Sequence, residues 1–370
     1  MASKVFFATA GGRFRQGPLD KLHMLFEAAG FPDVIREREL VAVKVHFGER
    51  GNTSFVSPQY IRAVVEDIAG CGGRPFLTDT GCLYFSDRAN ARDHLLIASE
   101  HGFGPLTTLA PVLIADGLRG SDVTPVKVGL KHFDSVDVAS GIHDAGSLIV
   151  VSHVTGHALT GFAATIKNLG MGGGGRRMKM AVHEMVRPSV NREKCELCEG
   201  CIENCPTGAV SRADGEIKID RDACYGCGEC LAICPHRAIE VRWEGDPMVA
   251  QEKLAEITCA VLANKRGRAG FFSFLINVTP TCDCWNYSAA PMVPDIGFLA
   301  STDPIAIDQA AADLVNRTPA TGAPGCGGKP DPNAPDMFMA AFGTDWSRQL
   351  LHGEELGLGT REYELVRVGD

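Results

Sequence analysis

The chain has 370 residues, of which 45% are hydrophobic and 22% are charged, as expected for a folded globular protein of two or three domains. Its formal net charge of −9 excludes the basic surface that nucleic-acid-binding proteins use, so we expect no nucleic-acid partner. The longest apolar run, residues 271–278, is interrupted by Ser and Asn and is too short to cross a bilayer, so we expect no membrane span.

Strands and helices alternate along the first half of the chain. Short stretches rich in Val, Ile and Phe predict strands at residues 4–9, 41–47, 75–78, 112–115, 126–130 and 147–152. Apolar residues at helical spacing predict helices at residues 18–29, 58–70, 88–100, 135–145 and 161–169. This alternation is typical of a mainly parallel open sheet with helices on both faces, which makes the fold class α/β.

The same alternation resumes near residue 244. We predict a helix at 248–263, strands at 270–278 and 296–300, and a helix at 303–315 that Asp303 caps. A loop rich in Gly and Pro (320–335), two short helices and a strand at 362–368 complete the chain. We therefore predict one α/β body, residues 1–188 and 244–370, interrupted by an inserted segment, residues 189–243.

The inserted segment holds eight of the 14 cysteines. They form two runs with the spacing C-x2-C-x2-C-x3-C, each followed by proline, and the runs are offset by 29 residues. The first run is Cys195, Cys198, Cys201 and Cys205, and the second is Cys224, Cys227, Cys230 and Cys234. Flanking residues follow the same offset, so the segment is predicted to contain two copies of one small unit.

Two 4Fe–4S clusters explain this spacing. Thiolates select iron–sulfur clusters or zinc, and zinc sites more often join two separate pairs of ligands or include His. In this pattern the fourth Cys of each run binds the other cluster. Cluster 1 would take Cys195, Cys198, Cys201 and Cys234, and cluster 2 would take Cys224, Cys227, Cys230 and Cys205. The segment resembles a bacterial two-cluster ferredoxin over about 50 residues.

The other six cysteines are scattered, which is not the pattern of a disulfide framework. Together with the expected clusters, this favours a reducing compartment, and we predict that the protein is cytoplasmic. Residues 172–175 are four consecutive glycines followed by Arg176 and Arg177, which predicts an anion-binding turn or a hinge beside the inserted segment.

Polar residues gather where predicted strands end. Open α/β sheets bind ligands beyond the carboxyl ends of their strands, so we expect one site there. The candidates are Lys44, His46, Asp79, His153, His157, Cys282 and Cys284, with Glu49, Lys167, Asn168 and Asp283 close by. The lysine can orient an anionic substrate, the histidines can move a proton, and the C-x-C pair can bind a metal or accept electrons. The alternative is a set of separate structural pairs, such as Lys44 with Asp79.

Several stretches resemble one known family. They are VAVKVHFGERG (41–51), FLTDTGCLY (76–84), VSHVTGHALTGFAATIKNLGMGG (151–173), TPTCDCW (279–285) and PDIGFLASTDPIAID (294–308). With the cysteine segment, they are similar to the iron–sulfur branch of the family called "domain of unknown function 362". The resemblance spans nearly the whole chain and implies an α/β body of unknown chemistry linked to a cluster module.

Three functions are compatible with these observations. The first is an iron–sulfur oxidoreductase whose clusters transfer electrons to or from a substrate site in the body. The second is an electron-transfer adaptor or ferredoxin-type carrier, and the third is a non-redox enzyme with structural clusters. We favour the first because most of the chain lies outside the cysteine segment. A redox partner protein and a small anionic substrate are then expected. No Rossmann fingerprint indicates a further organic cofactor, and the sequence indicates no oligomeric state.

Overall fold

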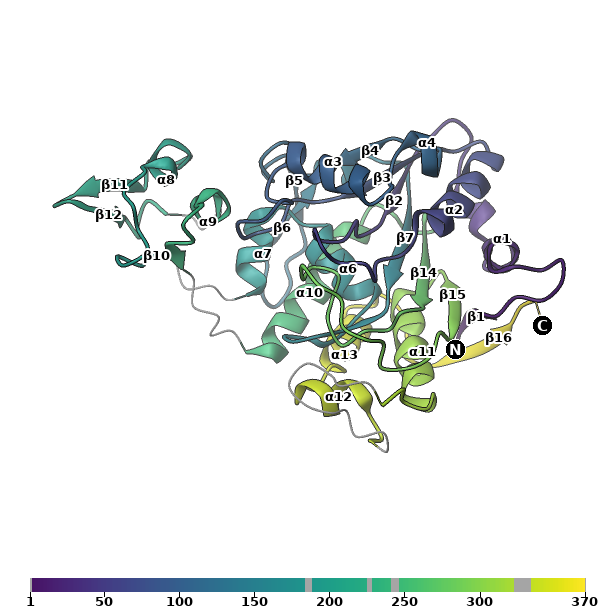
Figure 1. Ribbon diagram of the computed structural model, residues 1–370. Helices are drawn as coiled ribbons and strands as arrows, with labels where there is room; N and C mark the ends of the chain where they lie inside the picture. Colours follow the sequence, from purple (N-terminus) through teal and green to yellow (C-terminus); the bar gives the residue numbers. More distant parts are fainter. Residues whose placement is uncertain (1, 184–187, 225–227, 241–245, 323–333, 370) are drawn as a thin grey trace.

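A computed structural model describes residues 2–183, 188–224, 228–240, 246–322 and 334–369. Within these ranges the body is built on one eight-stranded sheet in the order β16-β1-β15-β14-β7-β2-β3-β4 (Figure 1). The strands are β1 (Ser3–Thr9), β2 (Leu40–Lys44), β3 (Arg74–Asp79), β4 (Val112–Ile114), β7 (Ser147–His153), β14 (Ala269–Leu275), β15 (Gly297–Ser301) and β16 (Tyr363–Arg367). β15 runs antiparallel to β1 and β14, while the other neighbouring pairs are parallel. The predicted α/β class with a mainly parallel sheet is therefore confirmed.

Helices cover both faces because the strand side chains alternate between two cores. In β7, Leu148 and Val150 face one core, while Ile149 and Val151 face the other. The first core is covered by α6 (Thr165–Gly172), α10 (Pro247–Leu262), α11 (Pro304–Arg317), α12 (Met337–Phe342) and α13 (Arg348–Glu355). The second is covered by α1 (Pro18–Ala28), α2 (Pro58–Gly70) and α3 (Ala91–Glu100). Asp303 caps α11 as predicted, since its side chain accepts hydrogen bonds from the N–H groups of Ile305 and Ala306.

Two predicted helices are wrong in part. Residues 135–145 form β6 (Ser135–Ala139), paired with β5 (Val123–Lys127), and then the short α5 (Ser140–His143). These residues form a strand because buried and more exposed side chains alternate along them. Val136 and Val138 are buried, and the polar residues beside them are more exposed. Residues 161–163 form β9 (Gly161–Ala163), which pairs with β8 (Thr155–His157), and the helix begins only at Thr165.

The cysteine segment forms a small unit, residues 189–240, which we call the module. It contains β10 (Ser189–Val190), α8 (Gly200–Glu203), β11 (Val210–Ala213), β12 (Glu216–Ile219), α9 (Glu229–Ile233) and β13 (Ile239–Glu240). The 29-residue offset superimposes β10 on β12, α8 on α9 and β11 on β13, so the repeat in the sequence is also a repeat in the fold. β10 pairs with β13, and β11 pairs with β12, so each small sheet takes one strand from each copy.

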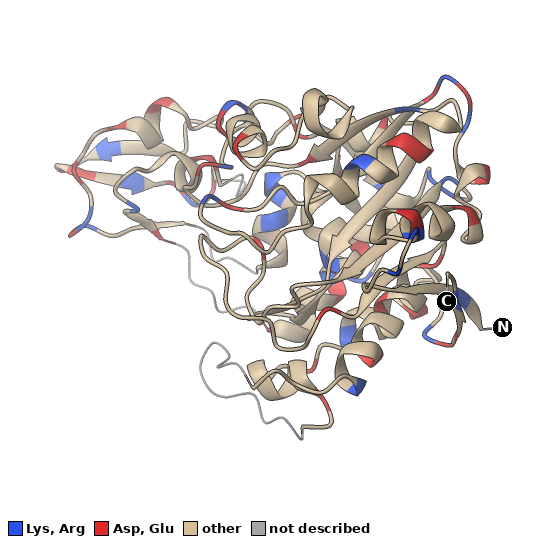
Figure 2. Ribbon diagram, turned by 45° about the vertical axis from the view of Figure 1, so that its right-hand side comes forward, with Lys and Arg blue, Asp and Glu red and all other residues tan. Residues whose placement is uncertain are grey.

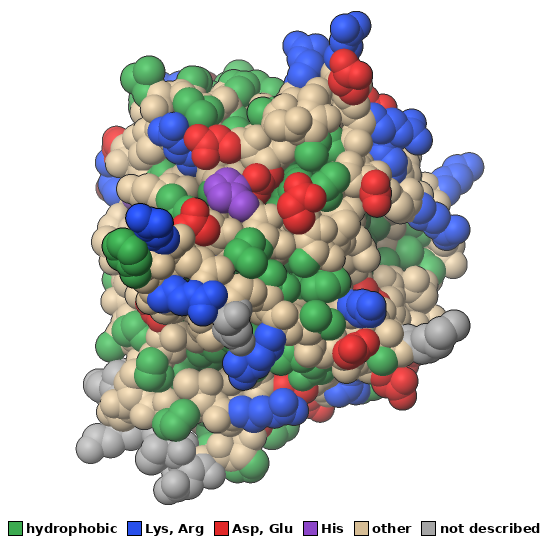
Figure 3. All heavy atoms as spheres, turned by 90° about the vertical axis from the view of Figure 1, so that its right-hand side faces the viewer, with side chains coloured by type: hydrophobic (Ala, Val, Ile, Leu, Met, Phe, Trp, Pro, Cys, Tyr) green, Lys and Arg blue, Asp and Glu red, His purple; other side chains and the backbone are tan. Residues whose placement is uncertain are grey.

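The module lies on one side of the body, beside α7 (Arg176–Val182), whereas both chain ends lie on the opposite side (Figures 1 and 2). Arg176 binds Glu229 of the module, and Arg119 donates to the Oδ1 atom of Asn204 at 2.7 Å. Basic and acidic residues are interspersed over the body and the module (Figure 2), and charges of both signs are mixed on the face turned away from the module (Figure 3). No helix in the described ranges has the length and apolar character needed to cross a membrane.

Candidate functional site

The module cysteines line two pockets. Cys195, Cys198 and Cys201 line the first pocket together with Cys234. Cys205 lines the second together with Cys224 and Cys230, while Cys227 lies outside the described residues. Each pocket therefore receives most of its thiols from one run and one thiol from the last cysteine of the other run.

Left-handed turns wrap the chain around these pockets. Leu197 and Glu199 have φ angles of 55° and 61°, which cost a non-glycine residue about 1–2 kcal/mol each. The second copy has Gly228 at the position of Glu199, with a φ of 73°. A Cβ atom at Gly228 would lie 2.6 Å from the Cδ1 atom of Leu83, so glycine is also required by the close approach of the body. At this position the backbone of the second copy packs directly against the body.

Lys44 and Asp79 form a buried ion pair where β2 and β3 end. Their Nζ and Oδ1 atoms are 2.9 Å apart, and Lys44 also donates to the Oδ1 atom of Asn168 at 2.7 Å. Burial alone would raise the pKa of Asp79, but the neighbouring basic groups, Lys44 first among them, together outweigh it and hold that pKa well below its usual range. A Cβ atom at Gly172 would lie 2.5 Å from the Lys44 Nζ atom. Gly172 therefore packs against this pair, while Gly173, Gly174 and Gly175 are buried against other side chains. The predicted anion-binding turn or hinge at residues 172–175 stays a prediction.

His46 lies next to a buried arginine. Its Nε2 atom is 3.2 Å from the Nη1 atom of Arg88, whose Nε atom donates to Glu49 at 3.0 Å. Burial, and then the charge of Arg88, lower the pKa of His46 well below its usual value, so this histidine is neutral. The Nη2 atom of Arg88 is buried and has no hydrogen-bond partner among the described residues. It is therefore a cationic donor available to an anionic group.

His153 is held by acceptors on both ring nitrogens. Its Nδ1 atom lies 3.0 Å from each carboxylate oxygen of Asp283, and its Nε2 atom lies 2.8 Å from the carbonyl oxygen of Ile276. Burial opposes the charged form, but the charge of Asp283 and the hydrogen bonds to Asp283 and to the backbone together outweigh it and raise the pKa of His153. With both nitrogens engaged, His153 positions the loop that carries Asp283 instead of exchanging protons with a substrate.

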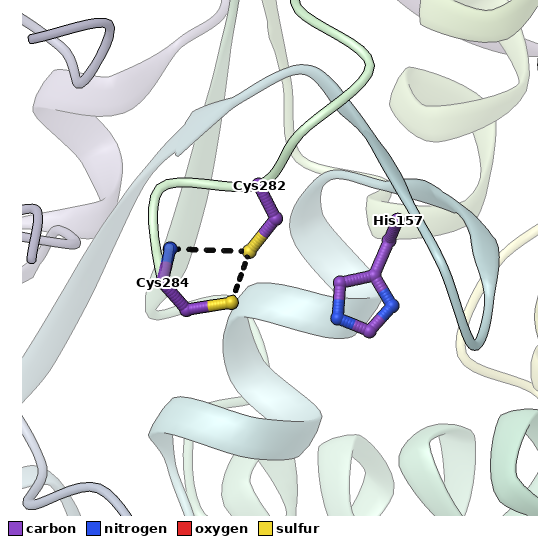
Figure 4. A group of neighbouring side chains, drawn as sticks. All are labelled: His157, Cys282 and Cys284. Atoms are coloured by element: carbon purple, nitrogen blue, oxygen red, sulfur yellow. Dashed lines mark hydrogen bonds between the residues drawn. The ribbon is translucent and has the colours of Figure 1, made fainter. Parts of the chain in front are cut away.

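Cys282 and Cys284 lie on the same loop, beyond the end of β14, with their sulfur atoms 2.7 Å apart. Figure 4 shows the two sulfur atoms pointing toward each other, with the ring of His157 beside them. The potential ligand atoms of these three residues lie within 4.8 Å of one another. The Nζ atom of Lys167 is 3.3 Å from the Cys282 sulfur. This arrangement offers either a three-ligand metal site or a pair of reactive thiols.

All seven predicted body residues therefore lie at one end of the sheet. Lys44, Asp79 and His153 end adjacent strands, and the charges of Asp79, Asp283 and Lys167 all act on His46. Two neighbours were not predicted, namely Arg88 and Tyr84, which come from the loop after β3. Tyr84 donates a hydrogen bond from its Oη atom to the carbonyl oxygen of Cys284 at 3.3 Å. A loop residue leaves no periodic pattern, so the signal in the sequence was the FLTDTGCLY stretch, which ends at Tyr84 and lies four residues before Arg88.

Residues 41–313 match the family model described as "Domain of unknown function (DUF362)". A search of the curated proteins gives no match. Among solved structures, the chain is similar to the lactate racemase apoprotein from Thermoanaerobacterium thermosaccharolyticum, with 11% identity and a TM-score of 0.39. That alignment covers 74% of this chain and 51% of the other, so this chain spans about half the length of that protein.

Proposed function

We propose that this chain, which belongs to the family described as "Domain of unknown function (DUF362)", is an iron–sulfur oxidoreductase. Two 4Fe–4S clusters in the module transfer electrons between a redox partner protein and a small anionic substrate, which binds at the carboxyl ends of β2, β3 and β7. The clusters need thiolate ligands, which persist in a reducing compartment, so the proposal places the protein in the cytoplasm.

The observation that carries the proposal is the composition of the first pocket. Its four cysteines, Cys195, Cys198, Cys201 and Cys234, are those expected for a cluster whose fourth ligand comes from the other run. Cys205, Cys224 and Cys230 are grouped in the same way around the second pocket. Thiols that converge on two separate spaces favour cubane clusters over zinc. His236 also lines the first pocket, but it follows the second run, and the four cysteines already supply a full set of cluster ligands.

The substrate site is supported by the unpaired donor on Arg88. A buried guanidinium N–H group without a partner is costly, and an anionic oxygen of a bound substrate would satisfy it. The neutral His46 lies beside it, with its Nδ1 atom accepting from the Gly48 N–H group at 2.9 Å and its Nε2 atom 3.2 Å from the Arg88 Nη1 atom, so it helps to position the guanidinium for the substrate. These groups fit a carboxylate or a similar small anion.

The partner is supported by the surface of the module. Cys198 is exposed, so cluster 1 would lie close to solvent, where another protein can approach it. The same observation favours the second candidate function, an electron-transfer adaptor without its own substrate. The two functions differ in whether any small molecule reoxidises the reduced protein in the absence of a partner protein.

Anaerobic purification followed by iron, sulfide and zinc analysis tests the cluster assignment. We expect eight irons and eight acid-labile sulfides per chain, with EPR signals from two clusters after reduction. A content of about four irons, or two zinc ions, would contradict it. Clusters that stay silent at all accessible potentials would favour the third function, a non-redox enzyme with structural clusters.

A further inference from the structure

We infer that Cys282 and Cys284 are a redox-active dithiol that opens and closes as a disulfide by exchanging one electron with each cluster. The inference rests on the proposed function, because the clusters supply or receive the electrons. It assigns a two-electron centre to the body, which would connect one-electron carriers to a substrate that reacts by two electrons.

The loop holds the two thiols on the same side. Asp283, between them, accepts from His153, and its carbonyl oxygen accepts from the Glu49 N–H group at 3.0 Å. The Trp285 N–H group donates to the Cys282 carbonyl oxygen at 3.1 Å, which closes a turn around the pair. With the backbone anchored at the central residue, both side chains point to the same space, as Figure 4 shows. The thiols are therefore positioned to react with each other.

The two thiols are chemically different. Cys282 is buried, and a hydrogen bond from Cys284 and the charge of Lys167 together lower its pKa to about 6, although burial opposes this. Cys284 is partly exposed, and its interaction with Cys282 raises its pKa well above the usual value. One sulfur is thus ready as a thiolate beside a lysine, while the other holds the proton and is closer to solvent, which is the asymmetry of reactive thiol pairs.

Two observations favour a dithiol over a metal site. The Nδ1 atom of His157 accepts from the N–H groups of Leu159 and Thr160, both at 3.3 Å, which places the proton of the neutral ring on Nε2. A histidine ligand would instead donate from the nitrogen that does not bind the metal. In addition, the ammonium of Lys167 already contacts the Cys282 sulfur and would repel a cation there.

One segment connects the module to this pair. Leu83 packs in a hydrophobic cluster with Cys201, Cys230 and Cys234 of the module. Tyr84, the next residue, packs against the same cluster and bonds to the Cys284 carbonyl oxygen. Tyr84 therefore links the dithiol loop to the hydrophobic cluster that Leu83 shares with the module cysteines.

The step balances without another reactant in the protein. When a low-potential one-electron donor has reduced both clusters, two electrons pass to the disulfide and its S–S bond breaks. Two protons from solvent complete two thiols, or one proton where Cys282 stays a thiolate beside Lys167. In the reverse direction, the S–S bond forms, protons leave, and each oxidised cluster gains one electron.

An anaerobic reductive titration of the holoprotein tests the inference. Protein is first oxidised with thionine and then titrated with titanium(III) citrate, a one-electron donor, while EPR follows the clusters. Alkylation and peptide mass analysis follow the two thiols. The wild type should take up four reducing equivalents, and Cys282→Ser and Cys284→Ser should each take up two with both clusters intact. Cys71→Ser, which alters a cysteine at the end of α2, should still take up four.

The outcomes separate the inference from the proposed function. Protein with complete iron and sulfide can contradict the dithiol in two ways: the wild type takes up only two reducing equivalents, or both thiols are fully alkylated after oxidation. Either result excludes the dithiol and leaves the cluster assignment unchanged. One zinc per chain that is lost in Cys282→Ser would also overturn the inference, in favour of a metal site. Protein without eight irons would contradict the proposed function instead.

Discussion

The module and the candidate site at the carboxyl ends of β2, β3 and β7 hold their reactive side chains in different ways. In the body, Lys44 binds Asp79 and His153 binds Asp283, so charged groups satisfy one another between two hydrophobic cores. In the module, the cysteines surround pockets, and the hydrophobic cluster is small. It joins Cys201, Cys230 and Cys234 to Val210, Ile217, Leu231, Ala238 and Ile239 of the module and to Leu83 and Met180 of the body. We therefore expect the body to fold through its own contacts, and the module to depend on the groups that its thiols are proposed to bind.

The largest expected effect is on the module when its iron is removed. Chelation under oxidising conditions should abolish hydrogen-exchange protection in residues 189–240, because units this small lack sufficient core without a bound group. Strands β7 and β14 should keep their protection, since both are buried throughout or nearly so. Hydrogen exchange with mass spectrometry measures both regions in one sample. A module that stays protected without iron would contradict the expected difference, because it would show that the module folds without a bound group.

The next effect is the loss of one cluster. Cys205→Ser should lower the iron content from eight to about four and remove the EPR signal of cluster 2, although Cys205 belongs to the first run. The physical reason is that Cys205 lines the pocket of Cys224 and Cys230. Cys259→Ser on α10 is the matched control and should keep eight irons. Loss of cluster 1 in Cys205→Ser would mean that each run binds its own cluster.

These two regions also differ in how far the sequence predicts them. The cysteine groups follow from spacing alone, since a short repeat with strict gaps leaves few ways to converge. Lys44, Asp79 and His153 follow from strand ends, because parallel strands bring their carboxyl ends to one edge. The cysteine spacing and the positions of the strand ends can both be read from the order of residues along the chain, without knowing how side chains pack.

Other features depend on side-chain packing and could not be predicted from the sequence. Arg88 becomes a site residue only because the loop after β3 folds back to place it beside His46 and Glu49. The interpretation of His153 as a proton donor changes once Asp283 and Ile276 occupy both of its nitrogens. Residues 135–145 were predicted as helical because alternation over only five strand residues is too short to outweigh helical spacing.

The third effect is on the free energy of unfolding of the body. It should fall when the buried ion pair of Lys44 and Asp79 is broken. Asp79→Asn leaves the Lys44 ammonium buried without its counter-charge, which costs about 3–5 kcal/mol. Urea unfolding followed by far-UV circular dichroism measures this change, and the iron content should remain eight. Asp87→Asn, which removes an exposed partner of Arg50, should change stability by only about 0–1 kcal/mol. Equal effects of the two substitutions would show that the body does not rely on buried charge pairs.

The smallest expected effect is a pH dependence from His153. Because its pKa is raised in the folded protein, the stabilisation it contributes is complete below the unfolded value of about 6.5. It is lost as the pH rises through the higher folded value. The stability advantage of the wild type over Asp283→Asn should therefore shrink as the pH rises from below about 6.5 through the higher folded value. A series of urea midpoints across this pH range measures the change, and an advantage that stays constant would show that His153 is not charged beside Asp283.

The position of the chain ends has a practical consequence. β1 and β16, the first and last strands, are parallel neighbours at one edge of the sheet, on the side away from the module (Figure 1). A tether attached to either end of the chain would therefore fix the molecule to a bead or an electrode with the module pointing outward. Immobilised in this way, the protein would present its cysteine pockets to a soluble redox protein, and voltammetry could detect their encounter directly.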